Sequence, residues 1–479
     1  MKSPILGSAY VARSVNAADA RMVNLFPEIV PEAGKEPAFL NRAPGLKLLA
    51  TVGNGPIRGL WAFASDDNTA FVVSGTQLYK IDSTYTATLI GSVSGTGPVS
   101  LADNGTQLFI ACNGPSYIYN NTTNAFGQIT DPDFPGAVTV CYLDGYFVFN
   151  EPNSQKMWIT SLFDGTSIDP LEFASAEGSP DGLTAVASNF REVWAFGTSS
   201  IEVWYNSGAT DFPLQRIQGA FNELGLAAPY SVAKMDNALF WLGRDRRGQG
   251  IVYRANGYLG QRISTHAVEW QIQQYEDMTD AIAYTYQQDG HSFYVLVFPT
   301  ANATWVYDVS TQAWHERAGF VNGEFIRHRG NCQMSFQGKP VIGDFENGNI
   351  YAFDLNNFSD NGSTQKWLRS WRALPTGQNN LKRTSQHSLQ LDIEPGVGLN
   401  LGQGSDPEVM LRWSDDGGHT WSNEHWAKIG KIGQFYRRVL WRRLGMTLKL
   451  RDRVYELSGT DPVKISIMGA ELILSPTNA

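Results

Sequence analysis

The feature that most constrains the fold of this 479-residue chain is a loose repeat of short strand pairs. Each unit is a variable strand, a polar turn and an aromatic strand that ends near Asp or Asn. Seven units follow one another, at residues 69–82, 106–120, 145–160, 192–206, 238–254, 292–308 and 339–354. Successive units start between 37 and 54 residues apart, close to the period of a four-stranded propeller blade. The repeat therefore predicts an all-β chain built around a propeller of six or seven blades.

The side-chain pattern inside the units is that of sheets packed on both faces. In "QLYKID" (77–82) and "NIYAFD" (349–354), apolar residues occupy both sides of the alternation. One blade cannot bury both faces alone, so the ring is expected to form as a unit. Two departures from the repeat predict short helices. They are "PLEFASAE" (170–177), with Ser167 or Asp169 as a cap, and "THAVEWQIQQYE" (265–276).

Two flanking regions do not follow the repeat. Residues 1–55 contain several prolines and few alternating runs, which predicts an extended N-terminal arm over the ring or over a neighbouring molecule. The predicted organisation is this arm, a propeller at 56–364 and a second, β-sandwich-like domain at 365–479. Longer strands are expected in the second domain at 387–394, 408–414, 437–444, 446–458 and 463–474.

The strand expected at 446–458 alternates between apolar and polar side chains, which predicts a half-buried strand with a basic outer face. The side chains expected to face the core are Met446, Leu448, Leu450 and Val454, and those expected to face outward are Thr447, Lys449, Arg451 and Arg453.

Charge is spread unevenly along the chain. The formal charge is −9, yet residues 426–464 hold ten Lys and Arg against three acidic residues, net +7, so the rest of the chain sums to −16. An acidic body with one basic region favours docking between copies or partners over general nucleic-acid binding. Aromatic residues interleaved with the cations at 426–443 leave base stacking as the alternative. The candidate subunit-interface or channel residues are Arg437, Arg438, Arg442, Arg443, Lys449, Arg451 and Arg453.

A short motif lies in the same domain. "RWSDDGGHTW" (412–421) has the spacing S-x-D-x-G-x-T-W, which resembles the Asp-box of sialidases; its residues are Ser414, Asp416, Gly418, Thr420 and Trp421. On a hairpin tip, Asp416 can accept backbone N–H bonds, Gly418 can take a positive φ, and Trp421 can pack under the loop. A sialidase usually has several boxes, an arginine cluster and a Tyr/Glu nucleophile pair. This chain has one box, which favours a structural turn. A glycan-binding or glycan-hydrolysing propeller is the alternative.

Other motifs of enzymes and membrane proteins do not emerge from the sequence. The spacings typical of metal sites, nucleotide-binding loops and nucleophile elbows are absent, which predicts a non-enzyme without cofactor or metal. Uninterrupted apolar runs of about 18 residues are also absent, so no membrane span is expected. The first residues lack the apolar core of a secretory signal, which predicts that the chain stays where it is made.

Four segments, at 196–208, 219–243, 252–269 and 411–445, resemble one known family. It is the family of packaged-DNA stabilisation proteins of short-tailed bacteriophages, also called tail hub or nozzle proteins. The last segment is the most specific, because the Asp-box-like turn is followed by a Trp-Arg-Arg-Leu-Gly strand and then by "RVYELSGTDPV" (453–463), as in that family.

The resemblance implies a structural protein of the virion tail that is made in the host cytoplasm. It implies propeller-bearing subunits, six around the tail axis, attached below the portal and its adaptor ring. It further implies a tail needle or plug, sites for fibres or spikes, and DNA that passes through the channel without sequence-specific binding. The family transfers no catalytic residue. The arm and the C-terminal domain are expected to form large obligate interfaces.

Overall fold

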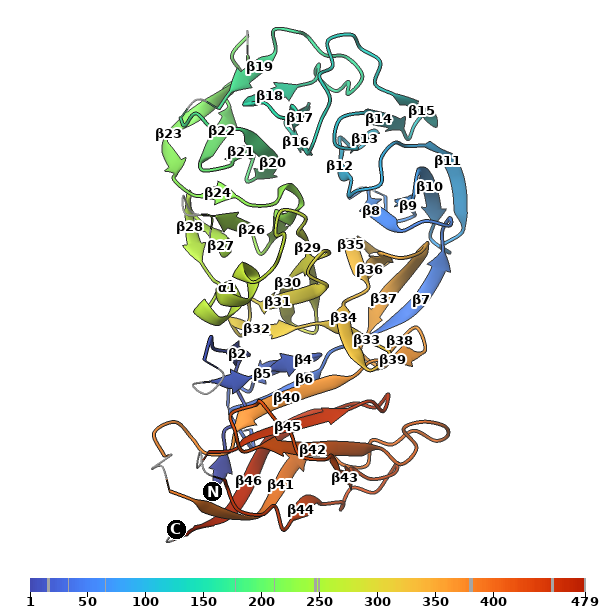
Figure 1. Cartoon of the computed structure of the whole chain (residues 1–479). Helices are drawn as coiled ribbons and strands as arrows, with labels where there is room; N and C mark the ends of the chain where they lie inside the picture. The colour runs from blue at the N-terminus through green and yellow to red at the C-terminus, as the bar shows by residue number, and fades with distance from the viewer. Residues whose placement is uncertain are drawn as a thin grey trace.

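The structure is a computed structural model that describes residues 1–14, 18–32, 34–64, 66–176, 178–210, 212–244, 248, 250–378, 382–448 and 452–477. Figure 1 shows a ring of small sheets with a two-layered β domain at one end. Both chain termini lie in that domain. The predicted all-β class with a propeller and a C-terminal sandwich is confirmed.

The ring contains seven blades within the described residues, each an antiparallel meander with its first strand nearest the centre. The first blade consists of β8 (Ile57–Ala62), β9 (Thr69–Ser74), β10 (Gln77–Asp82) and β11 (Ala87–Ser92). The second consists of β12 (Ser100–Asp103), β13 (Gln107–Ala111), β14 (Ser116–Asn120) and β15 (Ala125–Gln128). The third consists of β16 (Val140–Leu143), β17 (Tyr146–Asn150), β18 (Lys156–Ile159) and β19 (Phe173–Ser175). The fourth blade consists of β20 (Leu183–Asn189), β21 (Glu192–Gly197), β22 (Ile201–Asn206) and β23 (Leu214–Asn222). The fifth contains β26 (Ala238–Arg244), β27 (Gly250–Asn256) and β28 (Leu259–Arg262), and both β24 (Gly225–Leu226) and β25 (Ala233–Met235) pair with β26. The sixth blade consists of β29 (Ile282–Gln288), β30 (His291–Phe298), β31 (Ala303–Asp308) and β32 (Ala313–Glu316). The seventh consists of β35 (Gly330–Phe336), β36 (Lys339–Asp344), β37 (Asn349–Asp354) and β7 (Gly45–Thr51).

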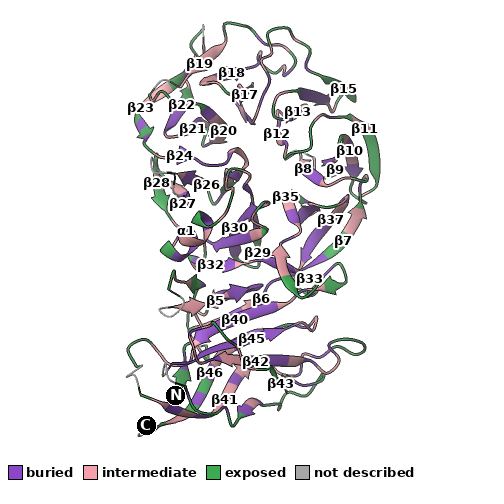
Figure 2. Cartoon of the chain, in the orientation of Figure 1, coloured by how far each residue is buried: buried purple, intermediate pink, exposed green. Residues whose placement is uncertain are grey.

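The seven predicted hairpins form the two middle strands of these seven blades. Their aromatic side chains fill the space between neighbouring sheets. Phe71 of β9 meets Tyr119 of β14 with ring centroids 5.0 Å apart, and Tyr286 of β29 stacks on Phe353 of β37 at 4.4 Å. Figure 2 shows the middle strands buried, while an outer strand such as β11 is largely exposed. Burial between blades, rather than within one, explains why the ring holds together as a unit.

The seventh blade takes its outer strand from the N-terminal part of the chain. β7 pairs antiparallel with β37, and Leu46, which is fully buried, lies opposite Phe353. The short strand β38 (Ser359–Asp360), paired with β39 (Ser363–Thr364), then adds in parallel to β7. The first and last parts of the ring are thus joined by backbone hydrogen bonds.

The C-terminal domain is a sandwich of two sheets that also contains N-terminal strands. One sheet has the order β44 (Val439–Arg442), β41 (Thr384–Ile393), β46 (Ser466–Pro476), β6 (Ala38–Arg42) and β5 (Leu25–Ile29), with β1 (Lys2–Ser3) on β46. The other contains β4 (Met22–Val23), β40 (Trp367–Arg372), β45 (Val454–Gly459), β42 (Glu408–Ser414) and β43 (His425–Lys428). Trp367, Trp371, Leu411 and Leu472 are among the buried residues of the core between them.

The predicted N-terminal arm is therefore corrected by strand pairing. Strands β1, β4, β5 and β6 belong to the sandwich and β7 to the propeller, which leaves the hairpin of β2 (Tyr10–Val11) and β3 (Asp19–Ala20) as a small separate sheet. These strands pair with strands of both domains, so residues 1–55 do not form a separate arm.

A buried joint connects the ring to the sandwich. β4 lies parallel to β32 of the sixth blade and antiparallel to β40, so one nine-stranded sheet runs through both domains. Next to it, the buried Arg42 donates to the carbonyl oxygens of Asp461, Val463, Phe358 and Gln365 and to Oε1 of Gln365. A hairpin of β33 (Ala318–Val321) and β34 (Glu324–Arg327) lies beside the joint.

One of the two predicted helices forms. α1 (His266–Gln273) starts after Thr265, whose side chain accepts a hydrogen bond from the backbone N–H of Val268. The helix predicted at 170–177 is wrong, because β19 occupies this segment and pairs with β18. Phe173 packs against Trp158 with ring centroids 4.9 Å apart, which favours the strand. A 3₁₀ turn, η1 (Pro229–Ser231), precedes β25.

Of the side-chain directions predicted for 446–458, that of Val454, which is fully buried, is confirmed, and those of Met446, Leu448, Thr447 and Arg453 are wrong. Met446 and Leu448 are 43% and 58% exposed, whereas Thr447 and Arg453 are 1% and 2% exposed. Thr447 exchanges hydrogen bonds with Thr384, which draws its side chain inward. β45 begins only at Val454, so the predicted long strand is shorter. Lys449, Leu450 and Arg451 lie outside the described residues.

Candidate functional site

The Asp-box-like motif forms the turn between β42 and β43. The Asp416 carboxylate accepts hydrogen bonds from the Ser414 hydroxyl at 2.7 Å, the backbone N–H groups of His419 and Thr420 at 3.0 and 2.9 Å, and the Thr420 hydroxyl at 2.6 Å. Gly418 has the predicted positive φ, +100°, and its N–H donates to the Ser414 hydroxyl. The bonds from Thr420, above all, lower the pKa of Asp416 well below its ordinary value. The motif therefore acts as a turn, and its Asp416 carboxylate is fully engaged by backbone N–H and hydroxyl donors of the same turn.

The two adjacent aspartates of the motif have separate partners. Asp415 forms a two-point ion pair with Arg453 at 2.7 and 2.8 Å, and Arg453 also donates to the Leu444 carbonyl at 2.6 Å. The half-buried Trp421 ring lies under the Arg412 guanidinium, 4.7 Å from its carbon. These contacts tie the turn to β45 and β42, which explains why Arg453 points inward instead of toward a partner.

We expect the Asp416→Ala variant to loosen this turn locally without unfolding the sandwich. The amides of His419 and Thr420 lose their acceptor, so their hydrogen-exchange rates should rise about tenfold or more, while core amides of β42 stay protected. Exchange measured by NMR or mass spectrometry checks this. The His419→Ala variant, whose exposed side chain is not part of the turn network, serves as control. Equal exchange in Asp416→Ala and the native chain would contradict the structural role.

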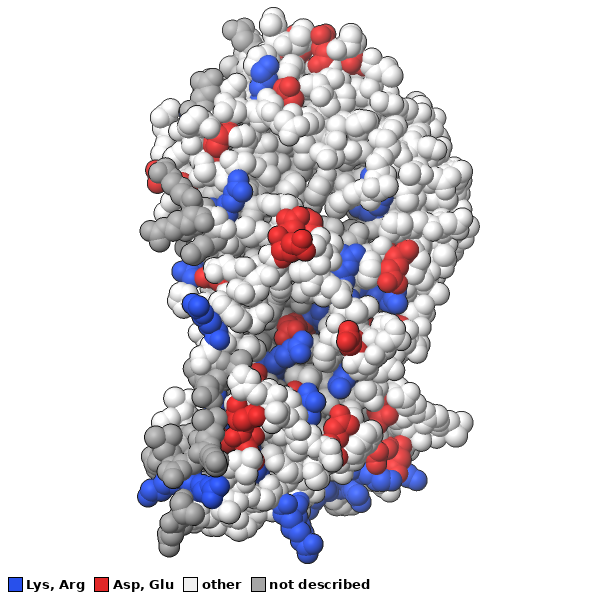
Figure 3. Space-filling view, viewed as in Figure 1, with Lys and Arg blue, Asp and Glu red and all other residues white. Residues whose placement is uncertain are grey.

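The other basic residues gather at the sandwich end farthest from the propeller, where Figure 3 shows a concentration of Lys and Arg. Arg437, Arg438, Arg442 and Arg443 are exposed in β44 and the segments on either side. Arg437 donates to the Lys428 carbonyl at 3.4 Å and Arg438 to Oε1 of Gln390 at 2.5 Å. None of the four forms an ion pair with a described residue. The structure thus brings four of the seven predicted basic residues together; Arg453 is buried, and Lys449 and Arg451 lie outside the described residues.

Apolar side chains accompany these cations. In the segment 431–436, Ile432, Phe435 and Tyr436 are 59%, 68% and 98% exposed. The segment is held by short-range bonds, including Gln434 N–H to the Lys431 carbonyl at 2.9 Å and Gly433 N–H to the Gly396 carbonyl at 3.3 Å. We call residues 426–443 the basic end. It combines cations with preformed exposed aromatics, the composition typical of protein–protein interfaces.

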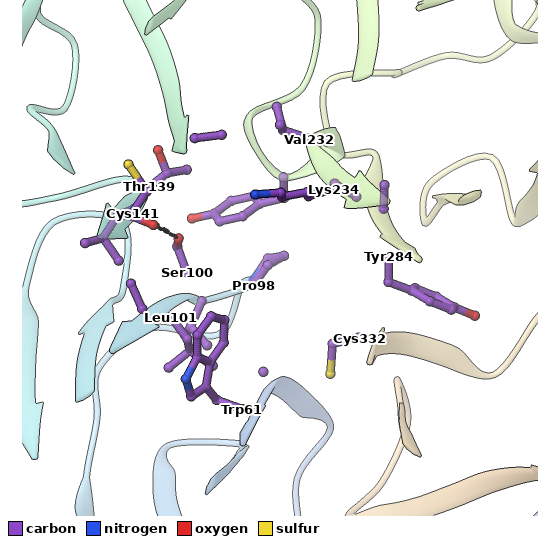
Figure 4. A pocket seen from close by; sticks show the side chains of 18 of the residues that line it. Trp61, Pro98, Ser100, Leu101, Thr139, Cys141, Val232, Lys234, Tyr284 and Cys332 are labelled. Carbon is purple, nitrogen blue, oxygen red and sulfur yellow. Dashed lines mark hydrogen bonds between the residues drawn. The ribbon is translucent and has the colours of Figure 1, made fainter. Parts of the chain in front are cut away.

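A central cavity of about 540 Å³ lies at the propeller axis and was not predicted from the sequence. It is lined from all seven blades, by residues that include Trp61, Ser100, Thr139, Ser188, Lys234, Tyr284 and Gln333. Figure 4 shows labelled side chains from several blades around one open space, with Ser100 bonded across to the next blade. Cys141 and Cys332 also line it, and burial raises the pKa of each thiol to about 12, which makes them poor nucleophiles. Period and alternation predict the ring, but the side chains at its axis come from seven distant segments.

Two searches of the described residues complete the survey of sites. No group of three or more His, Cys, Asp or Glu side chains comes together as a potential set of metal ligands in that part of the chain. Among the same residues, none of the helices has the length and apolar character needed to cross a membrane.

Comparison with solved structures finds low overall similarity to other proteins. YCF48 from Cyanidioschyzon merolae has a TM-score of 0.43 and 11% identity, over 64% of this chain and 98% of that one. Virginiamycin B lyase from Staphylococcus aureus has a TM-score of 0.42 and 12% identity, over 62% of this chain and 94% of that one. At these scores no property of either protein carries over to this chain.

Comparison of sequences gives a clearer result. The curated relative "Tail hub protein gp10" of Salmonella phage P22 is 22% identical over 444 residues, which cover 89% of this chain and 90% of the relative. Residues 1–357 match the family model described as bacteriophage P22 Gp10, beta-propeller, and residues 367–474 match the one described as bacteriophage P22 Gp10, beta-sandwich. The resemblance inferred from the four sequence segments is confirmed. Since these matches span most of the chain in the order in which the two domains occur, the chain belongs to the bacteriophage P22 Gp10 family.

Proposed function

We propose that the chain is a structural tail hub of a short-tailed bacteriophage virion and not an enzyme. One observation carries the proposal: the chain matches a tail hub protein along nearly the full length of both, with the propeller and the sandwich in the same order. The Asp-box-like turn supports a mechanical role, because its carboxylates are engaged with the backbone and with Arg453.

In more detail, we propose that the hub attaches below the portal and its adaptor ring. Six copies surround the tail axis, retain the packaged DNA together with a needle or plug, and form part of the ejection channel. Fibres or spikes dock on the outside. The buried joint at Arg42 and the sheet through β32, β4 and β40 support such a role, because they connect the two domains by hydrogen bonds.

The experiment that tests this function is a phage in which the gene for the chain is interrupted by a nonsense codon. Particles made in a non-suppressing host should package DNA and then lose it, so that their genomes become accessible to added nuclease. Supplying the intact chain during infection should restore retention. Stable, infectious particles that lack the chain would contradict the proposal, and would favour a propeller protein of the host cell instead.

The basic end is proposed as the docking surface of the hub. The Arg442→Glu, Arg443→Glu double variant should weaken ring assembly while leaving the fold intact, because both side chains are exposed and neither forms an ion pair with a described residue. Native mass spectrometry with the adaptor present measures the stoichiometry. Lys464→Glu, a reversal at an exposed lysine paired with Glu394 outside the basic end, is the control. Unchanged stoichiometry in the double variant would exclude these two residues.

A further inference from the structure

A buried contact between the two domains is built on the side chain of Phe26. Phe26, 5% exposed, belongs to β5 of the sandwich. Its ring centroid lies 5.0 Å from that of His291, 5.5 Å from that of Phe293 and 6.2 Å from that of His315. His291 and Phe293 lie on β30 and His315 on β32, all in the sixth blade. Phe26 thus closes the joint over a surface of this blade that contains two histidines.

The two histidines have different partners. Nδ1 of His291 lies 2.7 Å from the buried Asp308 carboxylate, and this hydrogen bond raises the pKa of His291. His315 is fully buried and forms no ion pair with a carboxylate of the described residues. Its Nε2 accepts from Nε of Arg317 at 3.2 Å, and its Nδ1 has no hydrogen-bond partner in the described part of the chain. Because a guanidinium can only donate, the His315 ring keeps a lone pair on Nε2 and is neutral.

A proton on His315 would disrupt this arrangement. Nε2 would become a donor, so the hydrogen bond from Arg317, which is 3% exposed, would be lost and two buried cations would face each other. The guanidinium also donates to the Tyr286 hydroxyl at 3.1 Å and lies 5.9 and 5.5 Å from the ring centroids of Phe26 and Phe293. None of these contacts supplies a negative charge. Burial, and then the charge of Arg317, lower the pKa of His315 well below its ordinary value.

The titratable and charged groups around His315 respond to acid in different directions. The elements packed against it present Tyr286 from β29, His291 from β30, Asp308 from β31, Glu28 from β5 and Arg317 directly after β32; beyond Arg317 lie Arg42, His328, Arg329 and Asp360. Hydrogen bonding raises the pKa of His291, and burial raises that of Asp360 to about 7, so both take up protons readily in the folded chain. Burial lowers the pKa of His328 to about 3, and its Nδ1 accepts from the backbone N–H of Gly330 at 3.0 Å. Acid therefore penalises His315 and His328 within this group, while it favours His291 and Asp360.

We propose that His315 is a pH sensor of the joint between the two domains, and that its protonation releases Phe26 and β5 from the sixth blade. Above about pH 6.5, the ordinary pKa of histidine, the ring is neutral whether the joint is closed or open. Below this pH the open joint takes up a proton that the closed joint excludes, so the stability of the closed joint is lost progressively as the pH falls. Between pH 7 and pH 5 this one group should raise the equilibrium constant for opening about twentyfold.

The test compares hydrogen exchange in the native full chain and in its His315→Gln variant at pH 7 and pH 5. Glutamine can accept the hydrogen bond from Arg317 but does not titrate. Between the two pH values, the protection factors of the amides at 22–29, corrected for the pH dependence of intrinsic exchange, should fall about twentyfold more in the native chain than in the variant. His419→Gln, at an exposed histidine of the Asp-box-like turn, is the matched control and should follow the native chain. Equal pH dependence in the native chain and in His315→Gln would overturn the inference.

A second measurement needs no variant. In the native chain with ¹⁵N-labelled histidine rings, the chemical shifts of the ring nitrogens report the charge of each of the seven histidines. At pH 5 the exposed rings should be charged, whereas the rings of His315 and His328 should keep the shifts of neutral imidazole. Seven charged rings in a chain whose amides at 22–29 stay protected would overturn the inference, because the closed joint would then hold the charged form of His315.

Discussion

The Arg42→Ala variant is expected to lose about 3 kcal/mol or more of unfolding free energy. Arg42 is 3% exposed and donates five hydrogen bonds, to four backbone carbonyls and one side-chain oxygen. Burial lowers the pKa of Arg42 to about 9, so the side chain is still charged at neutral pH. Removing it leaves several carbonyl oxygens of the buried joint without this donor.

The measurement is chemical denaturation followed by tryptophan fluorescence, since Trp367 and Trp371 are buried in the adjacent sandwich core. Arg13→Ala, which removes an exposed arginine of the same N-terminal region, is the control and should change stability by no more than about 0.5 kcal/mol. Equal midpoints for Arg42→Ala and the native chain would show that the joint between the two domains does not depend on this side chain.

The Leu46→Ala variant is expected to lose about 3 kcal/mol, because Leu46 is fully buried where β7 completes the seventh blade. Its neighbours in the core include Tyr286 and Phe353. Leu48, in the same strand, is 40% exposed, so Leu48→Ala should cost clearly less. The two variants remove the same side-chain atoms, so a difference in stability between them reports the difference in burial between Leu46 and Leu48.

Deletion of residues 1–51 is the stronger form of the same test. It removes β7 from the propeller and β1, β4, β5 and β6 from the sandwich, so the remaining chain should fail to fold to a soluble product. A soluble fragment with the native melting temperature, or equal stability of the Leu46 and Leu48 variants, would restore the independent arm expected from the sequence.

The parts of the fold predicted correctly are those with local signals. Each of the seven hairpins combines period-two alternation with a nearby polar turn, and Thr265 is a side-chain cap directly before α1. The strand predicted at 408–414 coincides with β42 for the same reason. The Asp-box-like turn was placed correctly because its spacing specifies bonds between neighbours.

The parts predicted wrongly depend on distant partners. Pairing of β7 with β37 joins residues about 300 positions apart, and the local sequence around residue 46 does not indicate this partner strand. Arg453 was expected outside because the alternation along 446–458 puts it on the polar face, but the Asp415 carboxylate and the Leu444 carbonyl accept its hydrogen bonds inside. For the same reason, the sequence located the basic end but not the central cavity, whose lining residues come from all seven blades.

The central claim, that this chain is a tail hub, is tested most directly by locating it in the virion. Purified particles of the phage that encodes the chain should contain it in a proteomic analysis, and gold-labelled antibody against it should mark the tail vertex in electron micrographs. Absence of the chain from infectious, gradient-purified virions, or label distributed over the capsid away from the tail, would contradict the account.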